Sequence, residues 1–247
     1  MDIAILETGL LPPELRDAWP GGYPAMMQAL LAAPYRRFHT FNVQEAPPPD
    51  PTRFDAVCVM GSPSGVYDGD PWIERLMDWL REARGETALV GVCFGHQVMA
   101  HAFGGHVEKA AVGWGLGRHA YEIAHRPDWM ADAPDRIASP CSHQDQVLVQ
   151  PPGTRVLAHS AFTPFAALAY EDHPAISFQF HPEFEADYAR ALVEVRRSRG
   201  VDPRLVDAAL DSLEHPNDRL MVGEWIGRFL DQSVSACTLA PAAYARG

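Results

Sequence analysis

The 247-residue chain lacks several features by which common classes of protein are identified. Its four cysteines are dispersed and none belongs to a C-x-x-C pair, so the pattern indicates reduced thiols rather than a disulfide framework. No apolar run approaches the roughly 20 residues that cross a bilayer, and the N-terminus has no cationic region followed by a long apolar stretch. We therefore expect a cytoplasmic protein with no signal peptide and no membrane span.

Basic residues are also scarce. Lysine and arginine number 20 against 32 aspartates and glutamates, which gives a formal net charge of -12. Surfaces that bind nucleic acid or anionic lipid need clustered basic residues, so we expect neither partner. Eleven histidines are present, but no two are two, three or four residues apart, as the members of local chelating pairs are. We expect no metal, and nothing in the sequence requires a cofactor.

The composition is that of an ordinary globular protein, with 47% hydrophobic and 21% charged residues. A chain of this length can bury a sizeable core without disulfides. No internal repeat and no second core is visible, so we predict a single domain over 1–247. Within it we expect a catalytic core at 1–185, a helical extension at 186–235 and a tail at 236–247.

Strand patterns alternate with helical patterns along the chain, which predicts an α/β fold. We expect three layers, with a mostly parallel sheet and helices on both of its faces. Asp70 and Pro71 fit the N-cap and first position of one helix. The expected strands are 2–6, 35–43, 54–60, 88–92, 105–109, 117–123, 146–149, 155–160, 165–170 and 175–180, and the expected helices are 24–33, 71–84, one directly after Cys93, 186–199, 203–213 and 219–232.

Cys93 stands where a short apolar strand meets a helix. A strand that turns sharply into a helix exposes the residue at the bend and points the next backbone N–H groups at a ligand. Gly91 and Gly95 flank the bend and remove side chains that would obstruct it. Free cysteine is nevertheless among the most buried residue types, and the local pattern fits a buried structural thiol equally well.

A second candidate group is His181-Pro182-Glu183. Proline cannot donate to a sheet ladder, so His181 lies at the end of a strand. Residues i and i+2 share a face of extended backbone, so Glu183 can reach the imidazole ring and fix its tautomer. A nearby imidazole activates a thiol, and with Cys93 these residues predict a Cys-His-Glu triad. By itself the motif also fits a surface turn.

Three segments resemble class I glutamine amidotransferases. Segments 91–97 (Gly-Val-Cys-Phe-Gly-His-Gln) and 178–184 (Phe-Gln-Phe-His-Pro-Glu-Phe) are similar to the two motifs of that family, in the expected order and 88 residues apart (181 minus 93). Segment 60–65 (Met-Gly-Ser-Pro-Ser-Gly) resembles its oxyanion loop, and with Trp72 and 142–147 it points to the branch similar to the GMP synthase glutaminase domain. The resemblance covers about residues 2–185. It implies the flavodoxin-like fold of this family, followed by extra C-terminal helices.

The resemblance also implies a role for each matching residue. Cys93 would attack the side-chain amide carbon of glutamine, and the backbone N–H groups of Phe94 and Ser62 would hold the oxyanion. His181 would protonate the departing ammonia and later activate water against the glutamyl thioester, while Glu183 orients the ring. The family loop more often has glycine at position 62. The substrate-binding residues expected from the same resemblance are Gly61, Gln97, Ser142 and His143.

The implied function is a free-standing glutamine amidotransferase or glutaminase-type hydrolase that acts on glutamine or a related γ-glutamyl compound. The sequence has no G-x-x-x-x-G-K-[ST] or Ser-Gly-Gly-x-Asp-Ser loop for ATP, and it ends 64 residues after Glu183 (247 minus 183). An ammonia-accepting synthetase would therefore be a separate subunit. Two alternatives stay open: a γ-glutamyl peptidase with the same triad, and a non-catalytic regulatory subunit of the same fold.

The last helix has an apolar face. We expect this face to pack back onto the domain, with formation of a homodimer as the alternative use. Its residues are Leu220, Met221, Trp225, Ile226, Phe229 and Leu230.

Overall fold

The computed structural model describes residues 1–239, and it describes side chains as far as residue 235. Of the expected tail, 236–239 belong to the last helix, whereas 240–247 lie outside the described residues. The side chain of Cys237 is also outside the described part. Within residues 1–239, no helix has both the length and the apolarity needed to cross a bilayer.

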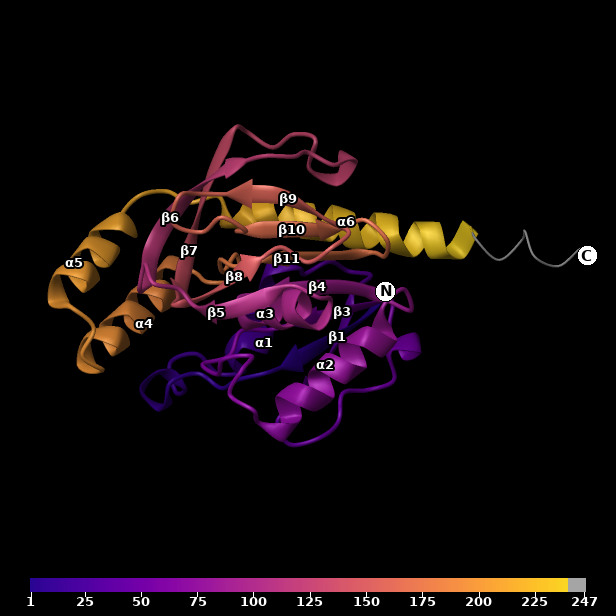
Figure 1. The fold of residues 1–247 in the computed structure, drawn as a ribbon, viewed down its shortest axis with the longest axis horizontal. Helices are drawn as coiled ribbons and strands as arrows, with labels where there is room; N and C mark the ends of the chain where they lie inside the picture. The colour runs from indigo at the N-terminus through magenta and orange to yellow at the C-terminus, as the bar shows by residue number, and fades with distance from the viewer. Residues whose placement is uncertain (240–247) are drawn as a thin grey trace, which may run out of the picture.

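A nine-stranded sheet lies at the centre, in the order β2-β1-β3-β4-β11-β10-β9-β6-β7 (Figure 1). Its first five strands are parallel to one another, and every pairing from β11 to β7 is antiparallel. A separate ribbon pairs β5 with β8. The strands are β1 (Asp2–Glu7), β2 (Arg37–Asn42), β3 (Ala56–Val59), β4 (Ala88–Val92), β5 (His106–Lys109), β6 (Gly115–Ile123), β7 (Arg136–His143), β8 (Asp145–Val149), β9 (Thr154–His159), β10 (Ala167–Tyr170) and β11 (Ala175–Phe178).

Helices cover both faces of the sheet, as the strand β1 illustrates. Ile3 and Ile5 belong to one apolar cluster and Ala4 and Leu6 to the other, because successive side chains of a strand point to opposite faces. The predicted α/β fold with helices on both faces is confirmed. The first cluster includes residues of α1 (Gly22–Leu30) and α6 (Arg219–Leu239), and the second includes residues of α2 (Pro71–Ala83) and α3 (Phe94–Ala102).

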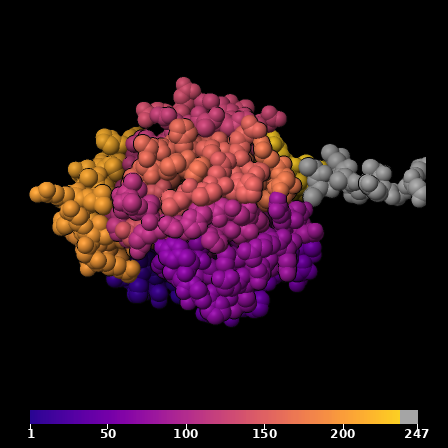
Figure 2. Space-filling view, viewed as in Figure 1, coloured from indigo at the N-terminus to yellow at the C-terminus, as the bar shows by residue number. Residues whose placement is uncertain are grey.

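The C-terminal extension consists of three helices, as expected. α4 (Ala186–Ser198) and α5 (Pro203–Ser212) gather at one end of the molecule, where they contact β6 and β7 (Figures 1 and 2). The apolar face of α6 packs back onto the sheet: Trp225 and Ile226 are buried, and the indole nitrogen of Trp225 donates to Asp132 at 3.0 Å. Leu220 is the exception and is exposed.

Three local features differ from the sequence-based expectations. No strand is predicted at 136–143, because Pro140 interrupts a run of small residues; β7 is an edge strand, where proline is tolerated. α6 continues to Leu239 rather than stopping at 232. Asp70 does occupy the N-cap position of α2, but its side chain makes no capping hydrogen bond with the described residues. Three short 3-10 helices complete the chain: η1 (Pro13–Leu15), η2 (Pro51–Arg53) and η3 (Asp128–Met130).

The start of α3 lies directly on the parallel strands. The N–H of Gly95 donates to the carbonyl of Met60 at 3.1 Å. A Cβ at Gly95 would lie 2.0 Å from the carbonyl oxygen of Val59, and one at Gly91 would lie 2.6 Å from the carbonyl oxygen of Gly95. Glycine at these two positions is what lets the helix follow the strand without a gap.

Gly95→Ala is expected to lower the free energy of unfolding by about 3 kcal/mol, because backbone atoms would have to move away from the new methyl group. Denaturant unfolding followed by circular dichroism measures the change. Gly227→Ala in α6 is the matched control, since a Cβ there meets only the flexible end of Arg36, at 3.1 Å. Its effect should stay within about 1 kcal/mol. Equal losses in both variants would contradict the close approach of α3 to the strands.

Candidate active site

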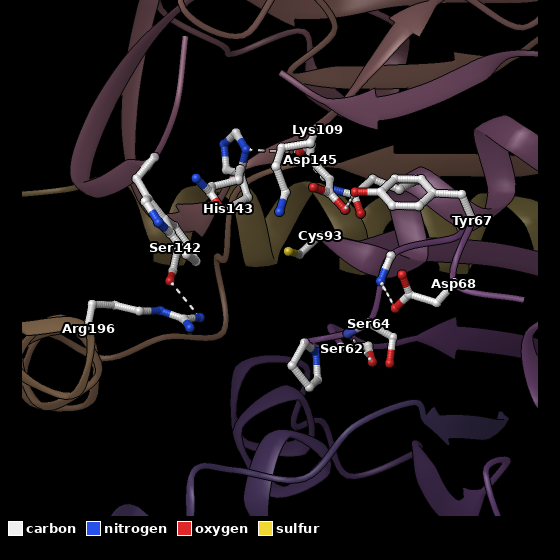
Figure 3. A pocket seen from close by; sticks show the side chains of 15 residues that line it. Ser62, Ser64, Tyr67, Asp68, Cys93, Lys109, Ser142, His143, Asp145 and Arg196 are labelled. Carbon is white, nitrogen blue, oxygen red and sulfur yellow. Dashed lines mark hydrogen bonds between the residues drawn. The ribbon is translucent and has the colours of Figure 1, made fainter. Parts of the chain in front are cut away.

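Cys93 forms the bend between β4 and α3. Its φ is 53°, and it is the one non-glycine residue with positive φ in the part of the chain that the structure describes. A backbone in this region costs about 1–3 kcal/mol and persists where neighbouring contacts enforce it. Here the N–H of Cys93 donates to the carbonyl of Phe178 at 2.8 Å. The thiol is 6% exposed and lies in the wall of a cavity (Figure 3).

His181 follows β11, the strand that neighbours β4 in the sheet. Its N–H donates to the carbonyl of Pro140 on β7 at 2.8 Å, and its ring stacks on Phe184 with centroids 3.8 Å apart. The Nδ1 atom lies 2.7 Å from Oε1 of Glu183, so a proton on Nδ1 is donated to that carboxylate. The ring also hydrogen-bonds to Cys93. The structure thus brings Cys93, His181 and Glu183 into one chain of contacts.

The charges of this group are strongly coupled. Burial by itself would lower the pKa of His181, but the carboxylate of Glu183 and the sulfur of Cys93 raise it to about 10. The ring therefore carries its proton at neutral pH. Because this pKa lies above the ordinary 6.5, the stabilisation is fully present below pH 6.5 and is lost as the pH rises through about 10.

The loop after β3 lies against the Cys93–His181 pair. A Cβ at Gly61 would be 3.1 Å from Cε1 of His181 and 3.7 Å from Cβ of Cys93. The backbone N–H groups of Ser62 and Phe94 have no hydrogen-bond partner among residues 1–239, so both are available to an incoming anion. The hydroxyl of Ser62 accepts from the N–H of Ser64 at 3.2 Å and holds the turn.

Two cavities border Cys93. The first, which we call the mixed-charge cavity, has a volume of about 300 Å³ and contains Lys109 and Arg196 as well as Asp68 and Asp145 (Figure 3). The second has a volume of about 210 Å³ and contains His181. Both signs of charge are present in the first cavity, so it suits a zwitterionic ligand such as an amino acid.

Gln97 and His143 are both fixed in the wall of the mixed-charge cavity. Nε2 of Gln97 donates to the carbonyl of Asp145 at 2.8 Å and to Oε1 of Gln179 at 3.1 Å, which leaves the amide oxygen of Gln97 as an acceptor. Nδ1 of His143 donates to the carbonyl of Asp145 at 3.2 Å. Burial lowers the pKa of His143 to about 3, so its ring is neutral. Both side chains are positioned to bind rather than to transfer protons.

Ser142 also lies in this wall, where its hydroxyl accepts from Nη2 of Arg196 at 3.4 Å. Arg196 is not among the residues expected from the sequence. A signal was available, because Arg196 follows Leu192 by four residues and Val193 by three, which puts a cation on the buried face of an amphipathic helix. Sequence reasoning also missed Tyr67, Asp68 and Lys109 as members of the cavity wall.

The other described cysteines differ from Cys93 in their surroundings. Cys58 in β3 is fully buried, and burial raises the pKa of its thiol to about 12. Cys141 in β7 is also buried, and its pKa is raised for the same reason. Neither lines a cavity at the site. Within residues 1–239, no group of three or more His, Cys, Asp and Glu side chains could hold a metal ion.

Sequence comparisons relate the chain to glutamine-hydrolysing proteins. The family model for glutamine amidotransferase class-I matches residues 27–193. A glutamine amidotransferase-like protein of Schizosaccharomyces pombe is 26% identical over 245 residues, which cover 92% of this chain and 98% of the relative. One subunit of the glutamine-hydrolysing GMP synthase of Methanopyrus kandleri is 33% identical over 54% of this chain and 68% of its own. For the longer GMP synthase of Thermosynechococcus vestitus, identity is 36% and only 23% of the relative is covered.

Solved structures give the same fold. A glutamine amidotransferase of Thermotoga maritima superposes with a TM-score of 0.73 at 18% identity, covering 94% of this chain and 97% of the other. A glutamine amidotransferase of Methylobacillus flagellatus gives a TM-score of 0.72 at 21% identity, covering 95% and 93%. At these identities the likeness extends to the fold.

Glu183→Gln is expected to lower the pKa of His181, because the carboxylate charge that raises it is removed. An opposite charge in contact typically moves a pKa by about 1–3 pH units, and we expect a fall of that size. An NMR titration of the ring protons of His181 measures it. Glu185→Gln is the control: Glu185 is exposed and pairs with Arg219 at 2.8 Å. An unchanged pKa in Glu183→Gln would contradict the coupling.

Proposed function

The chain belongs to the class I glutamine amidotransferase family, and from that premise we propose that it hydrolyses the side-chain amide of glutamine through Cys93, His181 and Glu183. The observation that carries the proposal is the contact chain from the thiol to the ring and from the ring to Oε1 of Glu183 at 2.7 Å. A binding subunit has no need of this arrangement, so the contact chain favours an enzyme over the regulatory alternative.

In the first step, Sγ of Cys93 attacks the amide carbon Cδ of glutamine. The negative charge that develops on the amide oxygen is stabilised by the backbone N–H groups of Ser62 and Phe94. His181 begins this step protonated, because its pKa lies near 10. It gives its proton to the amide nitrogen as the C–N bond breaks, so that ammonia leaves and a glutamyl thioester remains on Cys93.

In the second step, the neutral ring of His181 acts as a base. It removes a proton from a water molecule, which attacks the thioester carbonyl; the C–S bond breaks, glutamate leaves and the sulfur again faces a protonated ring. Glu183 holds the Nδ1 proton throughout, and its negative charge favours the protonated ring. The same N–H pair stabilises the second oxyanion.

The glutamyl part of the substrate is proposed to bind in the mixed-charge cavity. Lys109 and Arg196 are available to its carboxylate, and Asp68 and Asp145 to its ammonium group. Asp145 is held by the phenol of Tyr67, which donates to Oδ2 at 2.9 Å. The amide oxygen of Gln97 is a further acceptor for the ammonium group.

A separate synthetase subunit is the proposed acceptor of ammonia when glutamine is the substrate. The support is that two relatives, from Methanopyrus kandleri and Methanothrix thermoacetophila, are each named as one subunit of a glutamine-hydrolysing GMP synthase. Each is at least 33% identical over about half of this chain.

Cys93→Ala is expected to abolish the release of both ammonia and glutamate from glutamine, since no other described thiol lines the site. The affinity label diazo-oxo-norleucine should modify the wild-type protein at Cys93 and should not modify the variant. Cys58→Ala is the control, because this buried thiol in β3 is remote from both cavities. Glutamine turnover that survives Cys93→Ala would overturn the proposal.

Ser62→Ala is expected to keep most of its activity, because alanine retains the backbone N–H that stabilises the oxyanion. The loss in kcat for glutamine should stay well below the roughly hundredfold effect of removing an oxyanion donor. Ser64→Ala is the matched control in the same loop. A hundredfold loss confined to Ser62→Ala would instead assign the oxyanion contact to the hydroxyl group.

A further inference from the structure

The second cavity beside Cys93 is larger than ammonia requires. It has a volume of about 210 Å³, whereas a molecule of the size of water or ammonia takes up about 30 Å³ in a liquid. Its wall includes Cys93, His181 and the loop residues Gly61 and Ser62. The space adjoins the reacting atoms and is large enough for an amino acid.

The position of His181 decides which part of a substrate faces this cavity. His181 lines the second cavity and not the mixed-charge cavity, whereas Gln97 and Asp145 line only the latter. The leaving nitrogen must face the ring that protonates it. Any group attached to that nitrogen therefore extends into the second cavity, while the glutamyl part occupies the first.

The second cavity is cationic, and we call it the arginine cavity. Its wall contains Arg16, Arg196 and Arg199, and no aspartate or glutamate is among its lining residues. Arg196 and Arg199 lie one turn apart on the same side of the α4 C-terminal end, where residues i and i+3 are neighbours. This local excess of positive charge occurs in a protein whose net charge is -12.

The arginines of this cavity are poorly neutralised by the protein. Among the described residues, Arg16 and Arg196 have no carboxylate partner, and Arg199 reaches Glu14 only at 3.5 Å. The buried Nε atom of Arg196 has no hydrogen-bond partner in the described part of the chain. Burial lowers the pKa of Arg196, and the neighbouring charge of Arg199 lowers it further. An anion in the cavity would relieve both effects.

The rest of the wall is apolar. Leu11, Leu192 and Phe184 line the cavity together with the ring of Tyr23, and all four side chains are buried or nearly so. A ligand that fits both parts of the wall carries one carboxylate and an apolar side chain.

We propose that the arginine cavity binds the leaving group of the substrate, and that this group is an amino acid held by its carboxylate. The preferred substrates would then be γ-glutamyl amino acids with an apolar C-terminal residue, rather than glutamine itself. The inference rests on the thioester chemistry proposed above. It explains the volume, the charge and the side of the nucleophile on which the cavity lies.

The chemistry differs from glutamine hydrolysis only in the leaving group. Sγ of Cys93 bonds to the γ-carbonyl carbon, the bond from that carbon to the amino-acid nitrogen breaks, and the nitrogen takes the proton of His181. Water then splits the thioester with His181 as base, which returns glutamate and the thiol–imidazole pair. No oxidant, reductant or further reactant is needed.

The test compares two substrates of the same shape in the wild-type protein. γ-L-Glutamyl-L-leucine has the carboxylate, and γ-L-glutamyl-L-leucinamide lacks it; glutamine is the third substrate. The release of leucine, leucinamide, ammonia and glutamate gives kcat/KM for each. We expect the acid to exceed both the amide and glutamine by about tenfold or more, the usual effect of a charge-assisted hydrogen bond.

Variants of the rim arginines test the source of that preference. Arg16→Gln and Arg199→Gln are each expected to reduce the ratio of kcat/KM for acid over amide several-fold, and the double variant should bring it close to one. Arg204→Gln is the matched control: Arg204 is exposed on α5 and lines neither cavity. It should leave the ratio unchanged. Both rim arginines are exposed, so the variants are expected to fold.

The outcomes separate this inference from the proposed function. Cleavage of glutamine with equal rates for acid and amide, in wild type and variants alike, would overturn the leaving-group site and leave the proposed function standing. A preference for the acid that is lost only in the rim variants would support the site. Absence of cleavage of all three substrates, with Cys93 unlabelled by diazo-oxo-norleucine, would overturn both.

Discussion

One backbone hydrogen bond joins the two halves of the site. The N–H of Cys93 donates to the carbonyl of Phe178 at 2.8 Å, and so links the end of β4 to the strand that leads to His181. Two further backbone bonds complete the frame: Gly95 to Met60 at 3.1 Å, and His181 to Pro140 at 2.8 Å. Because the sheet fixes the backbone, the side chains meet without a flexible segment between them, which is the arrangement that a preorganised site requires.

The electrostatics of the site depend on burial as much as on charge. Glu183 is 1% exposed and His181 is 3% exposed, so each feels the other with little screening by water. That is why the pKa of His181 rises although burial by itself would lower it. The cavities extend the same pattern outward: one offers both signs of charge and the other offers arginine alone.

The C-terminal helices contribute directly to this surface. α4 carries Arg196, which lines both cavities and lies with its guanidinium 4.5 Å from the ring centroid of Trp114. Its side chain points from α4 toward Cys93 (Figure 3). The helical extension is thus part of the wall of the candidate site as well as a cover for β6 and β7. A residue of this extension can therefore influence which substrates reach the nucleophile.

The sequence alone determined the order of most elements and the bend at Cys93, because these depend on local rules: apolar periodicity, flanking glycines and a proline that ends a strand. It also put Glu183 within reach of His181, since two residues of extended backbone share a face. It did not reveal β7, whose Pro140 is acceptable only because the strand lies at the edge of the sheet.

Only the tertiary structure decided the charge of His181 and the shape of the two cavities. The ring's pKa depends on burial by segments far away in the sequence, and the arginine cavity combines Arg16 near the N-terminus with Arg199 near the C-terminal end of α4. Local pattern carries no information on which helix face meets which loop, since that is fixed when the separate segments pack together.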